Sequence, residues 1–243
     1  MPDPYYRADL SLVHHRGFGF HADLCAPGIL SLLEPVRANN GLVLELGCGS
    51  GLLTRHLVDA GHRVIASDAS AAMLAIAADY AEGAEDFQRI VMPDDPLPSV
   101  DAVVATGHPM NYLSSRAAIE RALIAAAGAL NPGGLLAVDL CDLEWGRDRK
   151  DSPPHARVGK DWALFTEFAT PSPDRFDRSM TTFLLSDDGT WRRDHEVHHN
   201  ILVDTSTVPI LLADHGVEAE VKGAFGDETL PVGLKAVIGR RHA

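Results

Sequence analysis

The sequence predicts an α/β fold: a doubly wound parallel sheet with helices on both faces, joined to a small antiparallel sheet. Leu42–Leu46 is apolar except for Glu45, which is the pattern of a strand buried on both faces. Similar strands alternate with amphipathic helices over residues 41–140, as in sheets covered on both sides. After residue 161 the hydrophobic period changes to two, which indicates antiparallel strands.

The first strand runs directly into a glycine-rich turn. Gly47, Gly49 and Gly51 occupy alternate positions, and residues 52–58 then carry apolar side chains at helical spacing. Glycine lets the main chain adopt angles closed to other residues and lets a ligand touch it. The following helix points its N-terminus at whatever binds in the turn. The unit of strand, turn and helix is therefore the expected ligand site.

Acidic residues on both sides of this turn indicate which ligand it takes. The glycine spacing is G-x-G-x-G rather than the G-x-G-x-x-G of dinucleotide sites. Glu45 precedes the first glycine, and Asp68 ends the next strand, residues 63–67, where an acid grips a ribose diol in doubly wound folds. These features describe a nucleoside without a pyrophosphate and with a cationic amine near Glu45, which fits S-adenosylmethionine (SAM).

Motif I and the post-I acid of class I SAM-dependent methyltransferases resemble two segments of this chain, Glu45-Leu46-Gly47-Cys48-Gly49-Ser50-Gly51 and Asp68-Ala69-Ser70. The turn Asn131-Pro132-Gly133-Gly134 is also typical of that family. The resemblance covers residues 40–140. It implies a Rossmann-like seven-stranded sheet in the order 3-2-1-4-5-7-6 with the last strand antiparallel, SAM as cofactor and S-adenosylhomocysteine (SAH) as product. Another Rossmann-like nucleotide binder is the alternative.

The resemblance also implies which residues hold the cofactor. Glu45 would bind the methionine amine, and Asp68 would bind the ribose hydroxyls. Backbone carbonyls at the end of the fourth strand, residues 101–106, would bind the methionine end. The family often has an acid directly after the third strand, residues 87–92, but this chain has none there, so backbone atoms of Met92 are expected to read the adenine, with help from Asp94. Met73 fits the adenine pocket and the core equally well. The predicted cofactor residues are Glu45, Gly47, Cys48, Gly49, Asp68, Ala69, Met73, Met92, Asp94, Thr106 and Gly107.

Two residues after the fourth strand are candidates for catalysis. His108 lies at the carboxyl edge of the sheet, where ligands gather, and a histidine near pKa 6.5 suits proton removal. It serves equally well as a loop residue before Pro109. Tyr112 could orient the substrate or simply pack. Methyl transfer is a direct displacement, so a base is needed only if the acceptor must lose a proton.

The chain divides into an N-terminal helical lid (residues 1–40), a SAM-binding core (41–150), an antiparallel β-meander insert of three strands (151–204) and the C-terminal part of the core (205–243). The insert resembles that of small-molecule methyltransferases, including those acting on amino sugars. Lid aromatics would close the site; the alternative is that they pack behind the sheet. The predicted substrate-binding residues are Tyr6, His14, Phe18, Asn111 and His198.

Composition limits the classes of partner that the protein is expected to bind. The net charge is −13 and no Lys/Arg-rich run occurs, which disfavours nucleic acid and acidic membranes. Three sparse cysteines and the lack of a signal-peptide pattern indicate a cytoplasmic protein. No paired-cysteine or H-E-x-x-H spacing indicates a metal. We expect a monomer or homodimer with a small-molecule acceptor.

These observations predict a methyltransferase that moves a methyl group from SAM to nitrogen or oxygen of a small molecule. One alternative is a SAM- or SAH-binding protein that does not methylate. The other is a protein or nucleic-acid methyltransferase, but residues 106–110 lack the N-P-P motif of enzymes that methylate base amines.

Overall fold

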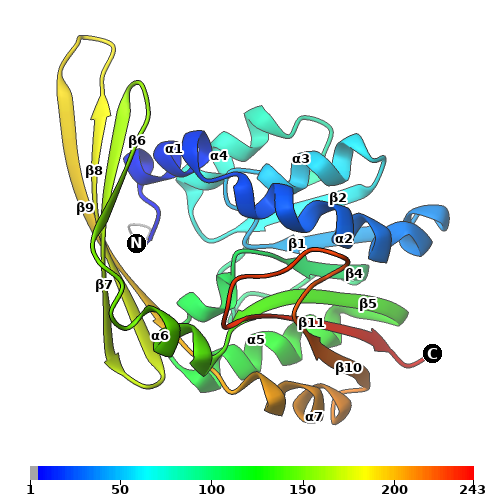
Figure 1. Cartoon of the computed structure of the whole chain (residues 1–243). Coiled ribbons are helices and arrows are strands. Elements are labelled where there is room, and N and C mark those ends of the chain that lie inside the picture. The colour runs from blue at the N-terminus through cyan, green and yellow to red at the C-terminus, as the bar shows by residue number, and fades with distance from the viewer. Residues whose placement is uncertain (1–4) are drawn as a thin grey trace.

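The computed structural model describes residues 5–243, which form a seven-stranded core sheet and a separate four-stranded sheet (Figure 1). The core order β3-β2-β1-β4-β5-β11-β10 confirms the prediction, with β11 antiparallel to both neighbours. The carboxyl ends of β1, β2 and β4 therefore meet at one edge. The core strands are β1 (Leu42–Leu46), β2 (Arg63–Asp68), β3 (Asp86–Arg89), β4 (Val100–Ala105), β5 (Leu130–Cys141), β10 (Val217–Lys222) and β11 (Leu234–Arg241).

Helices cover both faces of the core sheet. One face packs on α2, α3 and α4, and the other packs on α5 and α7 (Figure 1). Ser70 and Ser115 cap α4 and α5, since each side chain accepts a hydrogen bond from a backbone N–H of the first turn. The helices are α1 (Ala8–Gly17), α2 (Phe20–Ala38), α3 (Leu52–Asp59), α4 (Ala71–Tyr80), α5 (Arg116–Ala129), α6 (Leu143–Arg149) and α7 (Val208–Ala213), with short 3₁₀ turns η1 (Pro109–Tyr112) and η2 (Thr205–Thr207).

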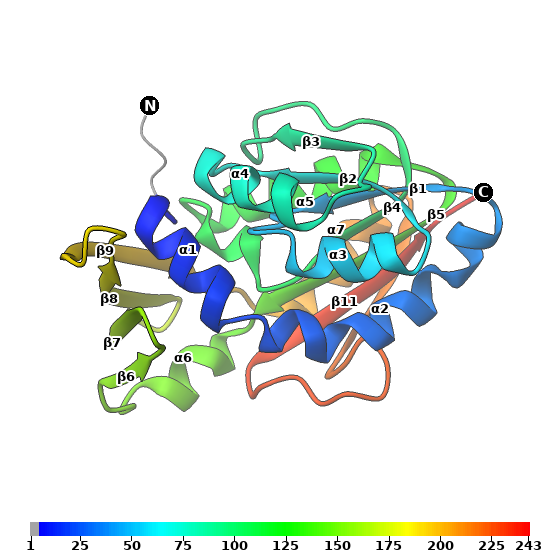
Figure 2. The same ribbon diagram turned by 90° about the horizontal axis from the view of Figure 1, so that it is seen from above.

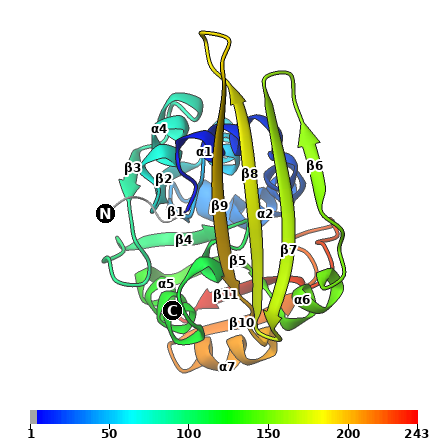
Figure 3. The same cartoon turned by 90° about the vertical axis from the view of Figure 1, so that its left-hand side faces the viewer.

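The insert is a separate sheet that lies beside the carboxyl edge of the core sheet (Figure 3). Its four antiparallel strands are β6 (His155–Val158), β7 (Trp162–Ser172), β8 (Arg175–Leu185) and β9 (Trp191–Ile201), in that order. The expectation of three strands was incomplete, because β6 lies in residues 141–160, where many charges and two prolines give no strand pattern. The same segment also contains α6. Alternate residues of the insert are buried, as period two requires.

Helix α1 was not predicted, and its stability comes from its surroundings. It has no side-chain cap, and it packs between α4 and the insert (Figure 2). Leu10 and Val13 are buried against Trp162 and Met180 of the insert. Residues 17–20 form the short joint between α1 and α2.

Other element boundaries also differ from the prediction. The third strand ends at Arg89 rather than Met92. Residues 205–213 form η2 and the short α7. No helix within residues 5–243 is both long and apolar enough to cross a membrane.

The insert leaves and re-enters the core at neighbouring points. Asp142 and Val203 form a parallel bridge, and Val203 N donates to Cys141 O (3.2 Å). The Asp142 carboxylate accepts hydrogen bonds from Glu144 N (3.0 Å) and from both the N–H and the hydroxyl of Thr205 (3.0 and 2.7 Å). The Asp142 carboxylate thus joins the segment that leads into the insert to the segment that leads back to the core.

Candidate active site

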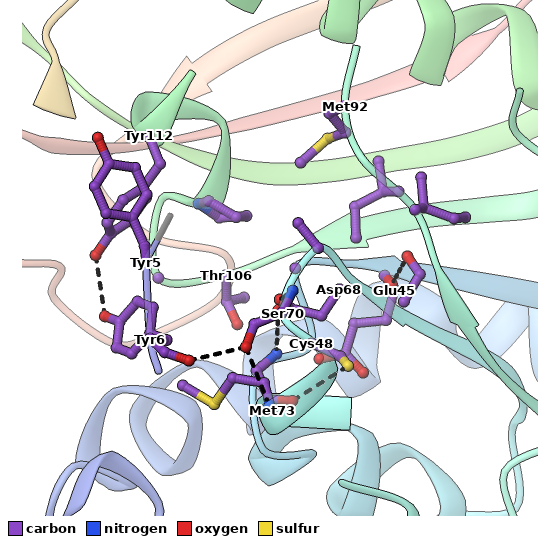
Figure 4. Close-up of a pocket in the computed structure, with 18 of the residues that line it drawn as sticks. Tyr5, Tyr6, Glu45, Cys48, Asp68, Ser70, Met73, Met92, Thr106 and Tyr112 are labelled. Atoms are coloured by element: carbon purple, nitrogen blue, oxygen red, sulfur yellow. Dashed lines mark hydrogen bonds between the residues drawn. The ribbon is translucent and has the colours of Figure 1, made fainter. Parts of the chain in front are cut away.

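A cavity of about 410 Å³ lies at the carboxyl edge of the core sheet. This size suits a small organic ligand. Its floor is the turn after β1, and its walls come from the ends of β2 and β4 and from the segment after β3. Aromatic side chains of the N-terminal segment and of η1 cover it (Figure 4).

The three glycines of the turn after β1 have different tasks. All three have positive φ (Gly47 +67°, Gly49 +56°, Gly51 +81°). A Cβ on Gly47 would lie 2.3 Å from Pro109 Cβ, and one on Gly51 would lie 3.1 Å from Ala77 of α4. A Cβ on Gly49 would meet nothing closer than Met73 at 4.0 Å. Gly47 and Gly51 therefore permit packing, while Gly49 leaves bare main chain toward the cavity.

Asp68 holds the ends of two strands together. Its Oδ2 accepts a hydrogen bond from Gly49 N (2.9 Å), and its Oδ1 accepts one from Ser70 N (2.8 Å). The carboxylate lines the cavity beside Ala69. Carboxylate oxygens have lone pairs beyond these two bonds, so Asp68 can still accept from ligand hydroxyls. This is the arrangement that a ribose diol needs.

Glu45 is a buried carboxyl with a cavity at its side. It is 2% exposed, and its Oε2 accepts a hydrogen bond from Thr54 Oγ1 (2.6 Å). Burial raises the pKa of Glu45 to about 8, and nearby Asp68 adds to the effect, although the Thr54 hydrogen bond opposes it. A cationic group in the cavity would favour the ionised form. The site therefore fits an ammonium ligand at Glu45.

The N-terminal segment is tied to both sheets. Tyr6 O accepts hydrogen bonds from Ser70 Oγ (2.9 Å) and Ser11 Oγ (2.7 Å). Tyr6 N and Arg7 N donate to the two carboxylate oxygens of Glu196 in β9 (2.8 and 2.9 Å). The Tyr6 and Tyr112 hydroxyls are 3.0 Å apart (Figure 4). This segment lies over the cavity, and its role as a lid stays a prediction.

Most of the predicted site residues meet at this one cavity. The lining includes all eleven predicted cofactor residues, and Arg121 of α5 lies 3.7 Å from Asp94 at its rim. Three predicted residues, His108, Asn111 and His198, do not line it. The predicted residues that do are Tyr6, His14, Phe18, Glu45, Gly47, Cys48, Gly49, Asp68, Ala69, Met73, Met92, Asp94, Thr106, Gly107 and Tyr112.

His108 is placed behind the cavity wall. Its ring is buried and stacks on Tyr112 with centroids 5.6 Å apart. Burial holds the pKa of His108 well below its usual value, and Arg178 and His21 lower it further. A general base works best with a pKa near the operating pH. The environment thus gives little support to His108 as the base.

Asn111 differs from the expectation that it contacts substrate. Its side-chain N–H₂ donates to Cys141 O (3.2 Å) and Ile201 O (2.6 Å), and its Oδ1 accepts from Cys141 N (2.9 Å). The residue is fully buried. These bonds join η1 to β5 and β9, so Asn111 positions the loop that carries Tyr112.

The sequence reasoning missed Asp139, Tyr5 and His21. Asp139 is fully buried in β5 and accepts hydrogen bonds from the N–H groups of Gly107 (2.9 Å) and His108 (2.6 Å). His21 Nε2 of α2 lies 2.9 Å from the same carboxylate. An acid inside the otherwise apolar run of residues 135–140 was the available signal. Tyr5 and His21 line the cavity but gave no pattern of their own.

No three His, Cys, Asp or Glu side chains of residues 5–243 gather closely enough to hold a metal ion. The expectation of a metal-free site stays a prediction.

Comparison with known proteins agrees with this geometry. Residues 43–134 match a family profile described as a methyltransferase domain. The matched residues run from β1 into β5 and include the glycine turn and Asp68. A protein from Geobacillus sp. (strain WCH70) that carries the name "putative methyltransferase" is 25% identical over 195 residues. The match spans 76% of this chain and 78% of that protein.

Solved structures share the methyltransferase fold over nearly the whole chain. A SAM-dependent methyltransferase from Clostridium acetobutylicum has a TM-score of 0.78 at 14% identity and covers 96% of this chain and 98% of its own. The sugar N-methyltransferase KedS8 from Streptoalloteichus has a TM-score of 0.79 at 21% identity, with 98% and 95% covered. The amino pentose methyltransferase CalS10 from Micromonospora echinaspora, solved with SAM, has a TM-score of 0.71 at 18% identity, with 98% of each chain covered.

The methyltransferase domain and the fit of the cavity together confirm SAM as the expected cofactor. Bare main chain at Gly49, a carboxylate at Asp68 and a buried carboxyl at Glu45 are the features that suit it. Which atoms each residue contacts belongs to the proposal below.

Proposed function

We propose that this protein transfers the methyl group of SAM to nitrogen or oxygen of a small-molecule acceptor. The observation that carries the proposal is the continuity of one cavity. It runs from Glu45, Gly49 and Asp68 to the aromatic cover formed by Tyr5 and Tyr112. A cofactor held at the first end would present its reactive group to an acceptor at the second.

The chain's own residues would divide the work as follows. Glu45 would bind the cofactor's ammonium group, Asp68 its ribose hydroxyls, and Gly49 would approach it with bare main chain. The segment 90–94 would cover the adenine, and the turn at Thr106 and Gly107 would face the methionine end. SAM supplies a methyl group already activated by its sulfonium, so the protein's main contributions are alignment and exclusion of water.

The aromatic cover supports a small acceptor rather than a polymer. Tyr6, His14 and Phe18 reach the cavity from the lid, and the insert packs against the outer side of this lid. A nucleic acid would need a basic surface, whereas the net charge is −13. The sugar methyltransferases among the structural neighbours support sugars and amines as the first acceptors to test. A cytoplasmic location and a monomeric or homodimeric state stay predictions.

The test has two parts. Calorimetry with SAM and SAH measures binding, and mass spectrometry measures SAH formed with a panel of amino sugars, hydroxylated sugars, simple amines and natural-product alcohols. We expect SAM to bind and at least one acceptor to yield SAH. Binding without turnover over a broad panel would favour a SAM-binding protein that does not methylate. Absence of binding would reject both readings.

A further inference from the structure

Buried polar atoms without partners cluster on the inner face of the insert, next to the cavity. His198 and Asn200 of β9 are 0% and 1% exposed. His198 Nδ1, both amide atoms of Asn200, and Nε of Arg178 in β8 have no hydrogen-bond partner. Arg178 lies directly opposite His198 in the strand register. Buried polar groups are rarely left unpaired, because each one costs free energy. Such a cluster therefore indicates a ligand.

Arg178 adds a charge that the protein does not neutralise. One of its terminal nitrogens donates to the Tyr112 hydroxyl, which is a neutral acceptor. Among residues 5–243, no carboxylate forms an ion pair with it. Glu196, which shares this inner face, already binds Tyr6 N, Arg7 N and His198 Nε2. A partly buried cation without a counter-ion is costly unless a bound anion compensates it.

Arg175 on the same strand shows the contrast. Its guanidinium pairs with Asp177 (2.9 Å) on the outer side of the insert, and it also contacts His199 Nδ1 (2.7 Å). Two arginines three residues apart therefore differ in one respect that matters here: Arg175 has a carboxylate partner and Arg178 has none.

The imidazoles around Arg178 are neutral. The pKa of His14 falls to about 4 through burial, with Arg178 lowering it further. Burial and Arg178 also lower the pKa values of His108 and His198, although Glu196 partly opposes the shift at His198. At neutral pH these imidazoles are uncharged. The imidazoles therefore add no positive charge of their own, and Arg178 is the cation that faces them.

We propose that the acceptor carries an oxyanion, a carboxylate or a phosphate, that binds Arg178. His198 and Asn200 would bind hydroxyl or amine groups of the acceptor next to that anion. The inference deepens the proposed function and rests on it. A guanidinium offers planar donors that match the oxygens of both anions. The neutral mixture of donors and acceptors at His198 and Asn200 suits polar, uncharged groups.

The acceptor would enter by displacing the Tyr5 side chain. The Tyr5 ring centroid lies 4.7 Å from that of His198 and 5.4 Å from that of Tyr112. Figure 4 shows Tyr5 and Tyr112 together at the end of the cavity away from Glu45. Tyr5 thus separates the cofactor cavity from the polar cluster.

The test follows Arg178 itself. Protein labelled with ¹⁵N in arginine and histidine is saturated with SAH and titrated with potassium phosphate, or in a second arm with potassium acetate, at ionic strength held constant with potassium chloride. We expect a saturable shift of the Arg178 Nε–H and His198 ring signals in at least one arm, and the stronger arm identifies the anion. R178K assigns the Arg178 signal.

Variants then localise the effect. R178Q should weaken anion binding, read at His198, by about tenfold or more, because a charged hydrogen bond is lost. The matched control R175Q should leave the titration unchanged. If R178Q fails to fold, the wild-type titration and R175Q decide the matter.

No saturable shift in either arm, with SAH still bound, would overturn the anion proposal and leave the proposed function standing. An equal loss in R178Q and R175Q would overturn it as well. Failure of SAH to bind would count against the proposed function, and the same titration without SAH would then decide the anion proposal.

Discussion

The cofactor end and the acceptor end of the cavity are built in different ways. At the cofactor end, Gly49 N and the Asp68 carboxylate bond across 19 residues of chain, and Asp68 is also bonded to Ser70 N. At the acceptor end, Tyr6 N and Glu196 bond across 190 residues, and several polar atoms have no partner. The cofactor end is built from residues close together in the sequence, and its polar groups already hydrogen-bond to one another. The second end comes together only in the folded protein and is completed by its ligand.

The largest expected effect separates two glycines of the cofactor end. Gly47→Ala should lower the free energy of unfolding by about 3 kcal/mol, because its Cβ would overlap Pro109 and the residue has positive φ. Gly49→Ala should cost only about 1 kcal/mol of stability, since its Cβ has room, yet it should weaken SAM binding. Urea unfolding and calorimetry test both. Equal stability losses would contradict the division of tasks between them.

Asp68→Ala should weaken SAM binding by roughly 30-fold or more, because hydrogen bonds to a charged group are lost. The matched control is Asp59→Ala on α3, whose carboxylate forms an exposed pair with Arg55. That control should change neither SAM affinity nor, by more than about 0.5 kcal/mol, stability. Calorimetry compares the two variants, and near-normal affinity in Asp68→Ala would remove the ribose assignment.

Glu45 predicts how the affinity for SAM depends on pH. With its pKa at about 8, the carboxyl is mostly protonated at pH 7 in the free protein and should ionise beside the ammonium group. Binding then releases a proton, so affinity should rise about tenfold per pH unit between pH 6 and 7. Because the folded pKa is raised from its ordinary value of 4.5, the free protein should lose stability as pH rises from about 4.5 to about 8, and stability should level off above that. Calorimetry in buffers of different ionisation enthalpy measures the proton release, which Glu45→Gln should abolish.

The smallest expected effect belongs to the acceptor end. Glu196→Gln should lower stability by about 1–2 kcal/mol, because the carboxylate that holds Tyr6 N and Arg7 N is lost. Glu167→Gln on the exposed side of β7 is the matched control and should have almost no effect. Thermal unfolding, together with proteolysis of the N-terminal segment, tests the pair. A lid as resistant in Glu196→Gln as in the control would show that this contact does not hold it.

The same contrast explains how far the sequence could predict the structure. The strand at residues 42–46, the glycine turn and the acid at Asp68 are all local patterns. They carry the resemblance that implied the correct sheet order, and the cofactor residues predicted from it all line the cavity. Helix α4 has a local start signal as well, because Ser70 supplies its cap.

The rest depends on contacts between distant residues. Helix α1 and strand β6 lack strong local signals and are held by the insert and by β7. The chemical type of residue 108 suggested a base, whereas the folded environment keeps that imidazole neutral. Partners decide whether Arg175 or Arg178 is free, and no pattern in the sequence distinguishes the two.

The parallel bridge between Asp142 and Val203 has a practical consequence. Because the segments entering and leaving the insert are neighbours there, residues 143–202 form an excursion from the core whose two ends lie side by side. A corresponding segment from another enzyme of this fold could be grafted with only two junctions, provided that Asp142 and Thr205 are retained. Such chimeras would exchange acceptor preference while the nucleoside-binding half stays untouched.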